Sequence, residues 1–441
     1  MGTRQIIALS ANTLFIIGVA SVISCTTPRL LTSSNAKKQV KPVNDTEIPA
    51  GRSTIALINV NIIDGKGGDA VSNGFVLVKA GRIEAIGQMG SFKIPENAET
   101  IDGKGMSLLP GFIDSHFHLD RVKDLPALFL QNGVTSLRDP GAWIEAYAEE
   151  RKSGKQMPRL FLTGPHLDGS PPAYPYDAFV VRDESEAVKQ VNDAADEGAS
   201  AIKVYFRIPP ALIKVITEAA HKRGLPVTAH LEITEAMQAI EAGLDGIEHI
   251  TSFGLSFIPK REAEKYRQGM LASNDFRKQG RYAMWENLDV NGPKADSLAR
   301  FLVKKGTFVS PTLGAFEYQA GTGVPDKTKL KGFNAMKSFT EKLQKSGVKL
   351  VLGSHSMITY AEKGWAFQRE MELWVESGIS PSDVIVAATM ENARFFRIED
   401  QLGSIEKGKI ADLVLVRGNP LEDIKAVRNV ERVMIGGEWV R

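Results

Sequence analysis

The chain has 441 residues, of which 43% are hydrophobic and 24% are charged. These fractions are typical of globular proteins and argue against a disordered, collagen-like or multi-span membrane chain. Lys plus Arg number 54 and Asp plus Glu 52, so the net charge of +2 gives no electrostatic case for nucleic-acid binding. The single cysteine excludes an intramolecular disulfide and a cysteine-based zinc site. The length predicts one large domain or two smaller ones.

The N-terminus predicts export. Residues 6–24 are mostly apolar and uncharged and follow Arg4, an order typical of a secretory signal. The run ends at Val22-Ile23-Ser24-Cys25, which resembles the signal of bacterial lipoproteins, where the cysteine becomes the lipidated first residue. We therefore expect a signal peptide over 1–24 and a lipid anchor on Cys25, facing the periplasm or the outer membrane. A plain signal peptide or an uncleaved anchor is the alternative.

Residues 25–52 are polar and lack periodicity, which predicts a flexible tether. After it, residues 53–62 alternate apolar and polar side chains in the manner of a half-buried strand. Similar short segments follow at 75–79 and 82–87, and others recur near the far end at 411–417 and 430–440. We expect one small β-sandwich built from 53–110 and 404–441.

Between these ends, apolar strands alternate with longer helical segments. Candidate strands are 107–116, 133–138, 159–163, 200–206, 225–231, 245–250, 307–311 and 348–353. Candidate helices are 183–196, 210–223, 233–242, 296–305, 333–346 and 365–377. This α/β pattern predicts a (β/α)8 TIM-like barrel over 111–403, although doubly wound sheets share the alternation.

One connection, 251–295, is long and rich in Arg, Lys and aromatic residues. Insertions of this length are usually functional or mobile. At the C-terminal face of a barrel it would form a lid or a wall of the substrate site. A surface helical hairpin with no role in binding is the alternative.

Four histidines fall at the ends of predicted strands. His116 and His118 are two residues apart, so both imidazoles point to the same side and can reach one ion. His230 and His249 each end a further strand. Catalytic groups of barrels gather at these C-terminal strand ends, so the four together indicate a metal site.

Lys203 lies within an apolar strand, where a charged amine is costly to bury. A shifted pKa, an acidic partner or covalent chemistry would relieve that cost. Carbamylation would turn the amine into a carboxylate-like metal ligand. The alternative is an ion pair with a nearby acid such as Asp139.

The chain resembles the amidohydrolase superfamily, in its imidazolonepropionase-like and prolidase-like branch. The resemblance rests on PGFIDSHFH at 110–118, IKVY at 202–205, TAH at 228–230, IEH at 247–249 and the closing segment 389–416. It implies a barrel with a β-sandwich and two divalent metals, usually zinc. By motif match, His116 and His118 would hold one metal, His230 and His249 the other, and carbamylated Lys203 would bridge them.

The match fails at the eighth strand. Family members carry an Asp there that binds metal and moves the proton of the attacking water, whereas this chain has His355 in Leu-Gly-Ser-His-Ser. A neutral imidazole that binds metal through one nitrogen cannot accept a proton on it. His355 would therefore substitute as ligand or as general base, or another group such as Asp139 or Glu232 would do so, or hydrolysis would be lost.

Three further residues are weaker candidates. Tyr205, two residues after Lys203, could hydrogen-bond the scissile carbonyl or the developing oxyanion. His166 could touch substrate, and Arg207 could hold a substrate carboxylate. An ordinary structural role is an equal alternative for each. His221 is expected to be a solvent-facing residue near a helix end, and the absence of a Gly-x-Ser-x-Gly elbow argues against a serine hydrolase.

The sequence thus predicts an exported, membrane-anchored metal-dependent hydrolase of an amide, cyclic amide or dipeptide C–N bond. Small molecules or peptides would be its substrates, and esters or lactones would suit the same site. A metal-binding lipoprotein without turnover is the rival from another class. The oligomeric state is open, a homo-oligomer included.

Overall fold

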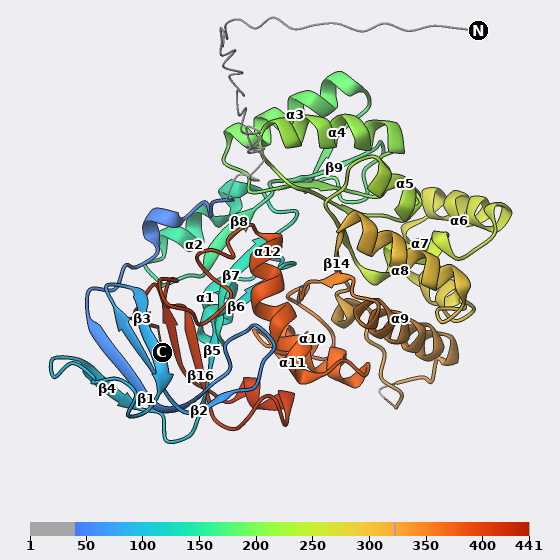
Figure 1. Ribbon diagram of the computed structural model, residues 1–441. Coiled ribbons are helices and arrows are strands. Elements are labelled where there is room, and N and C mark those ends of the chain that lie inside the picture. Colours follow the sequence, from blue (N-terminus) through green and yellow to red (C-terminus); the bar gives the residue numbers. More distant parts are fainter. Residues whose placement is uncertain (1–39, 322, 441) are drawn as a thin grey trace, which may run out of the picture. The chain divides into compact units, whose positions relative to one another are not determined.

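The computed structural model describes residues 40–321 and 323–440, all within one structural unit, Lys38–Arg441 (Figure 1). The predicted signal peptide, Cys25 and most of the tether lie outside the described residues. Within the described ranges, every helix is too short or too polar to cross a bilayer.

A mixed sheet combines strands from both ends of the chain, as predicted. Its strands follow the order β18-β17-β16-β5-β1-β2-β3, and β4 pairs with β1. Their bounds are β1 (Thr54–Ile62), β2 (Val71–Lys79), β3 (Arg82–Gln88), β4 (Glu99–Asp102), β5 (Ser107–Pro110), β16 (Leu413–Val416), β17 (Val430–Ile435) and β18 (Glu438–Trp439). The two ends meet where β5 pairs antiparallel with β16, and buried side chains such as Ile55, Leu108 and Leu413 form the core on one face.

The segment 107–116, predicted as one strand, is two. It leaves the mixed sheet as β5, turns at Gly111 and enters a second sheet as β6 (Phe112–Asp114). A Cβ on Gly111 would lie 2.3 Å from Oγ1 of Thr135, so a larger residue does not fit at this crossing. Alternation of apolar residues could not reveal the break, because both halves are buried.

The central strands are parallel and form two sheets. One contains β6, β7 (Val134–Asp139) and β8 (Arg159–Leu162). The other runs in the order β10 (Ala178–Val180), β9 (His166–Asp168), β11 (Ile202–Val204), β12 (Val227–His230), β13 (Gly246–Glu248), β14 (Phe308–Ser310) and β15 (Lys349–Leu350).

The α/β class is therefore established, but the described strands do not form one closed ladder. Backbone hydrogen bonds join the two sheets at both seams. The N–H of Ser200 donates to the carbonyl of Leu162 at 2.7 Å, and that of Ser115 donates to the carbonyl of Leu352 at 3.0 Å. Because all these strands are parallel, their carboxyl ends share one edge.

Helices follow the strands, and all six predicted segments are confirmed. The helices are α1 (Leu125–Gln131), α2 (Ala148–Lys152), α3 (Glu184–Asp196), α4 (Pro210–Lys222), α5 (Ala236–Glu241), α6 (Lys260–Ala272), α7 (Asn274–Trp285), α8 (Pro293–Lys305), α9 (Lys327–Lys345), α10 (Ala366–Glu376), α11 (Pro381–Val386) and α12 (Asn392–Phe395). Local signals set their ends. Asp183 caps α3 by accepting from the N–H of Glu186, and Gly306 ends α8 in the left-handed conformation.

The long connection 251–295 folds as a helical hairpin of α6 and α7 after a short 3-10 segment, η3 (Ile250–Ser256). Ser273 starts α7 by accepting from the N–H of Phe276. Helix α7 packs against α9 and η3, which fixes the face that it turns inward (Figure 1).

Candidate metal centre

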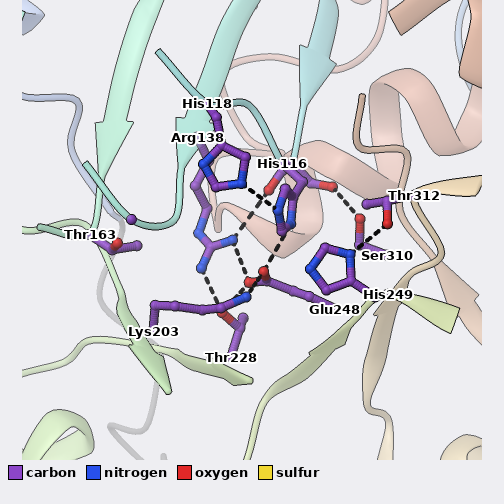
Figure 2. Close-up of polar contacts among 12 residues, drawn as sticks. His116, His118, Arg138, Thr163, Lys203, Thr228, Glu248, His249, Ser310 and Thr312 are labelled. Carbon is purple, nitrogen blue, oxygen red and sulfur yellow. Dashed lines mark hydrogen bonds and ion pairs between the residues drawn. The ribbon is translucent and has the colours of Figure 1, made fainter. Parts of the chain in front are cut away.

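Six of the seven histidines line one cavity of about 770 Å³ at the carboxyl edge of the parallel strands. They come from separate elements: His116 and His118 follow β6, His166 begins β9, His230 ends β12, His249 follows β13 and His355 follows β15. Figure 2 shows the side chains of His116, His118 and His249 directed toward one another. The seventh, His221, lies in the last turn of α4, exposed and 2.8 Å from Asp245, as expected of a solvent-facing residue.

Unusual backbone geometry accompanies two of these histidines. His249 and His355 adopt φ of +65° and +58°, and Ser356 follows at +55°. Such values are uncommon outside glycine and concentrate at functional sites. Hydrogen bonds hold both turns, because the N–H of His249 donates to the carbonyl of Ser310 and that of His355 to the carbonyl of His116, each at 2.7 Å.

Asp114 ties the first strand of the site to the last. Its Oδ1 accepts from the backbone N–H of His116 and of Ser354, both at 3.0 Å. Burial raises the pKa of this carboxyl to about 6. Asp114 thereby positions His116 and, through its neighbour Ser354, His355.

The histidine nitrogens fit a divalent ion. The Nε2 atoms of His116 and His118 lie 3.1 Å apart, close to the roughly 3.3 Å that two nitrogen ligands of a tetrahedral zinc ion would show. His116, His249 and His355 each offer a nitrogen within 4.8 Å of the others. Nδ1 of His230 has no polar partner among the described residues, whereas its Nε2 lies 3.3 Å from Oε1 of Glu232, and its ring lies 4.4 Å from that of His249. A buried imidazole nitrogen without a partner is a group that a metal would satisfy.

Neighbouring groups orient two of these rings. The Nδ1 of His116 lies 2.9 Å from Oε2 of Glu248, and the Nδ1 of His249 lies 2.7 Å from Oγ1 of Thr312. The carboxylate of Glu248 can only accept, so it favours the hydrogen on Nδ1 of His116 and leaves Nε2 of that ring free to bind an ion, whereas the hydroxyl of Thr312 can donate or accept.

Most of these rings are neutral at pH 7; His118 is the exception, because the effect of burial is outweighed by its contact with Asp139, which raises its pKa. Burial lowers the pKa of His355 to about 3. Burial also lowers the pKa of His230 to about 4, against the opposing effect of Glu232. The pKa values of His116 and His249 fall well below the usual range, again through burial and then through other cationic groups nearby. Neutral imidazole is the form that binds metals.

Lys203 does not pair with Asp139. Its Nζ contacts Oε2 of Glu248, whose other oxygen accepts from Nη1 of Arg138 at 2.8 Å and from the hydroxyl of Thr228 (Figure 2). Lys203 is 3% exposed, and burial lowers the pKa of its amine well below the usual value. The predicted ion-pair alternative thus exists, with Glu248 as its acid.

Asp139 is occupied by other donors. It accepts from the backbone N–H of Leu119 at 3.0 Å and from the hydroxyl of Tyr147 at 2.7 Å, and it lies 3.6 Å from Nδ1 of His118. Burial opposes ionisation, but the contact with His118 and these hydrogen bonds lower the pKa of Asp139 overall. The carboxylate therefore holds the β7 end and His118 in place.

Of the weaker candidates, Tyr205 and His166 line the cavity and Arg207 does not. The ring of Tyr205 lies 4.5 Å from that of His166 and 4.7 Å from that of His230. Arg207 instead stacks on Phe206 at 4.2 Å and lies 3.8 Å from Asp168.

Helix α7 supplies residues that the sequence did not single out. Arg277 is 2% exposed and donates to the hydroxyl of Tyr205 at 3.0 Å and to Oε2 of Glu232 at 3.3 Å. Arg281, one turn later, also lines the cavity. The many Arg and Lys residues in 251–295 indicated a wall of the substrate site. Only the spacing of four between these two arginines could have shown which helix face would point into that site. Glu248 could have been found as a charged residue inside the predicted apolar strand 245–250.

Parallel strands carrying neutral histidines at their carboxyl ends define a metal-dependent α/β protein of the hydrolase type. The sequence model of the Amidohydrolase family matches residues 107–440, and the chain belongs to that family.

Its relatives are distant. An adenine deaminase from Clostridium botulinum (strain Loch Maree / Type A3) is 23% identical over 414 residues, covering 88% of this chain, and the chain spans only 57% of that relative's length. An N-acyl-D-aspartate deacylase from Alcaligenes xylosoxydans xylosoxydans is 42% identical over 64 residues, which are 14% of this chain and 12% of that protein.

Solved structures share the fold, and several are prolidase-like. A protein from Bifidobacterium longum assigned as a prolidase gives a TM-score of 0.69 at 25% identity, over 89% of this chain and 95% of its own. A Xaa-Pro dipeptidase with bound methionine gives 0.66 at 22% identity, over 88% of this chain and 99% of its own.

Proposed function

We propose that this protein is a metal-dependent hydrolase that cleaves an amide, cyclic amide or dipeptide C–N bond. The observation that carries the proposal is the gathering of neutral, buried histidine nitrogens from separate strand ends in one cavity. Membership in the amidohydrolase family supports the same reaction type.

A divalent ion would lower the pKa of a water molecule at this site and polarise the scissile carbonyl, and zinc is the ion that we propose. His116, His249 and His355 are the residues we assign to hold it, with His118 and His230 beside them. Lys203 would bridge two ions if it were carbamylated, and that step requires its amine to leave Glu248.

Tyr205 is suited to hold the substrate carbonyl. Its hydroxyl oxygen accepts from Arg277, which leaves the hydroxyl hydrogen available for donation into the cavity. Burial raises the pKa of Tyr205 above its usual value, so the group remains a neutral donor. A donor placed before the reaction stabilises negative charge as it develops on the carbonyl oxygen.

His355 replaces the family's aspartate, and we assign it as a metal ligand. Its ring is stacked on that of His116 at an interplanar angle of 12°, and its nitrogen lies within reach of those of His116 and His249. A general base at His355 is the alternative, and the two differ in whether removing the ring removes the metal.

For the substrate, we propose a small peptide or N-acyl amino acid. Prolidase-like structural neighbours favour this class, and esters or lactones would react at the same site. The N-terminal sequence supports export and a lipid anchor, which fits the scavenging of nutrients outside the cytoplasm.

A binding protein without turnover is the second candidate, favoured by the loss of the strand-eight aspartate. The test is hydrolysis of a panel of dipeptides, N-acetyl amino acids and lactones by zinc-loaded protein and by its His116→Ala variant. Turnover that disappears with His116 supports the hydrolase. Stoichiometric metal with no turnover of any compound favours the binding protein.

A further inference from the structure

One wall of the cavity carries a concentration of positive charge. Helix α7 contributes Arg277, Lys278 and Arg281 to the lining. Arg277 and Arg281 are four residues apart, so they stand one above the other on the same helix face. Neither belongs to the histidine cluster.

The positive charge of this wall is only partly balanced. Glu232 is the carboxylate in contact with it, 3.3 Å from Nη1 of Arg277 and 3.8 Å from Nη2 of Arg281. One negative charge thus faces three positive charges within the described residues. Two other acids of the lining are associated with His118: Asp139 lies 3.6 Å from its Nδ1, and Asp120 interacts electrostatically with it.

Both arginines lie beside the proposed reaction centre. Arg277 shares a hydrogen bond with Tyr205, whose ring is 4.7 Å from that of His230. Arg281 lies over the ring of Phe316 at 5.1 Å, and that ring is 5.9 Å from His249.

Arg277 has hydrogen-bonding capacity to spare. It is 2% exposed, and its Nε is buried without a hydrogen-bond partner among the described residues. Its Nη2 donates to the hydroxyl of Tyr174 at 2.9 Å, so two tyrosine hydroxyls and a guanidinium converge at one place. This arrangement suits a carboxylate, which accepts several such donors.

We propose that the cavity selects substrates whose leaving amine is a dicarboxylic amino acid. One carboxylate would bind Arg277 and the hydroxyl of Tyr174, which leaves Tyr205 for the scissile carbonyl, and the other would bind Arg281 and Lys278. Aspartate and glutamate carry two carboxylates on a short carbon chain, which matches two cations one helical turn apart. A neutral side chain would leave the second cationic position unpaired, and a basic one would be repelled. This inference rests on the proposed hydrolytic function.

The first experiment measures binding, which does not depend on turnover. L-glutamate, L-glutamine and L-lysine are titrated calorimetrically into the full chain loaded with zinc. We expect glutamate to bind at least about tenfold more tightly than glutamine, because a charge-assisted hydrogen bond commonly contributes that much. Lysine should bind more weakly than glutamine.

Charge reversal tests which residues are responsible. Lys278→Glu changes an exposed side chain, and Lys278→Glu with Arg281→Glu reverses the wall. Lys265→Glu is the matched control, because Lys265 is exposed on α6 outside this cavity and the substitution changes the net charge equally. The single variant should reduce the preference for glutamate, the double variant should invert it in favour of lysine, and the control should leave it unchanged.

Hydrolysis of N-acetyl-L-glutamate and N-acetyl-L-glutamine separates this inference from the proposed function. Selective binding of glutamate without hydrolysis of either compound would keep the carboxylate-binding subsite and count against the proposed hydrolytic function. Equal binding of glutamate and glutamine, or a preference that survives double reversal, would overturn the subsite even if both compounds were hydrolysed.

Discussion

Glu370 provides a test of the packing behind the cavity. Its side chain lies in α10 and is fully buried. Its Oε1 accepts from the N–H of Leu313 and from Nε1 of Trp374, both at 2.8 Å, and its Oε2 accepts from the N–H of Gly314 at 2.7 Å. These bonds fix the 3-10 segment Leu313–Phe316, two of whose residues, Ala315 and Phe316, line the cavity.

Burial raises the pKa of Glu370 from 4.5 to about 7. Between pH 4.5 and about pH 7 the carboxyl of Glu370 is therefore protonated in the folded protein and ionised in the unfolded chain. The corresponding stability is fully present below about pH 4.5 and is lost as the pH rises through about 7, a change of about 3 kcal/mol for a shift of this size.

The perturbation is Glu370→Gln. The amide cannot ionise, so the variant should lack this loss of stability between pH 5 and pH 8. At pH 5 it should be less stable than the wild type by about 1–3 kcal/mol, because its NH₂ group faces the N–H of Gly314 or Leu313.

The assay is urea-induced unfolding of metal-free wild type and variant at pH 5 and pH 8. Other titrating groups contribute equally to both proteins, so the difference between the two pH dependences isolates Glu370. An identical pH dependence in the two proteins would refute the assigned burial and pKa of this carboxyl.

Three further variants address the site. His355→Ala should lower both the zinc content and the turnover if the ring is a metal ligand, and His355→Asp should retain zinc and raise the rate of hydrolysis. An unchanged zinc content and an unchanged rate in both variants would exclude every role assigned to His355. Asp114→Ala should destabilise the protein by about 2–6 kcal/mol, since two buried N–H groups lose their acceptor, whereas Asp114→Asn should cost less because its oxygen still accepts from both. Arg277→Met should raise KM for N-acetyl amino acids about tenfold or more while Arg277→Lys recovers part of the loss, and an equal KM in all three proteins would contradict its contact with substrate.

The histidine cluster was predictable because each histidine's position relative to its own strand can be read from the local sequence. Each of His116, His230 and His249 ends an apolar strand, and parallel strands bring their carboxyl ends to one edge. His355 could be placed only through the resemblance of its segment to the family.

The remaining features depend on long-range packing. The partner of Lys203 is Glu248, 45 residues away, because the register of β11, β12 and β13 brings these side chains together across strands. The inward face of α7, with Arg277, is set by its packing on α9 and η3, which no periodicity within 251–295 specifies. The division at Gly111 is likewise tertiary, since it follows from the close approach of Thr135.

The most direct test of the account is the metal content of the purified protein, expressed with zinc and bicarbonate and then dialysed. We predict about one zinc per chain from His116, His249 and His355, rising to about two if Lys203 is carbamylated, and a loss of that zinc in His116→Ala. A wild-type protein that retains no divalent metal after this treatment would contradict the central claim that the histidine cavity is a metal centre.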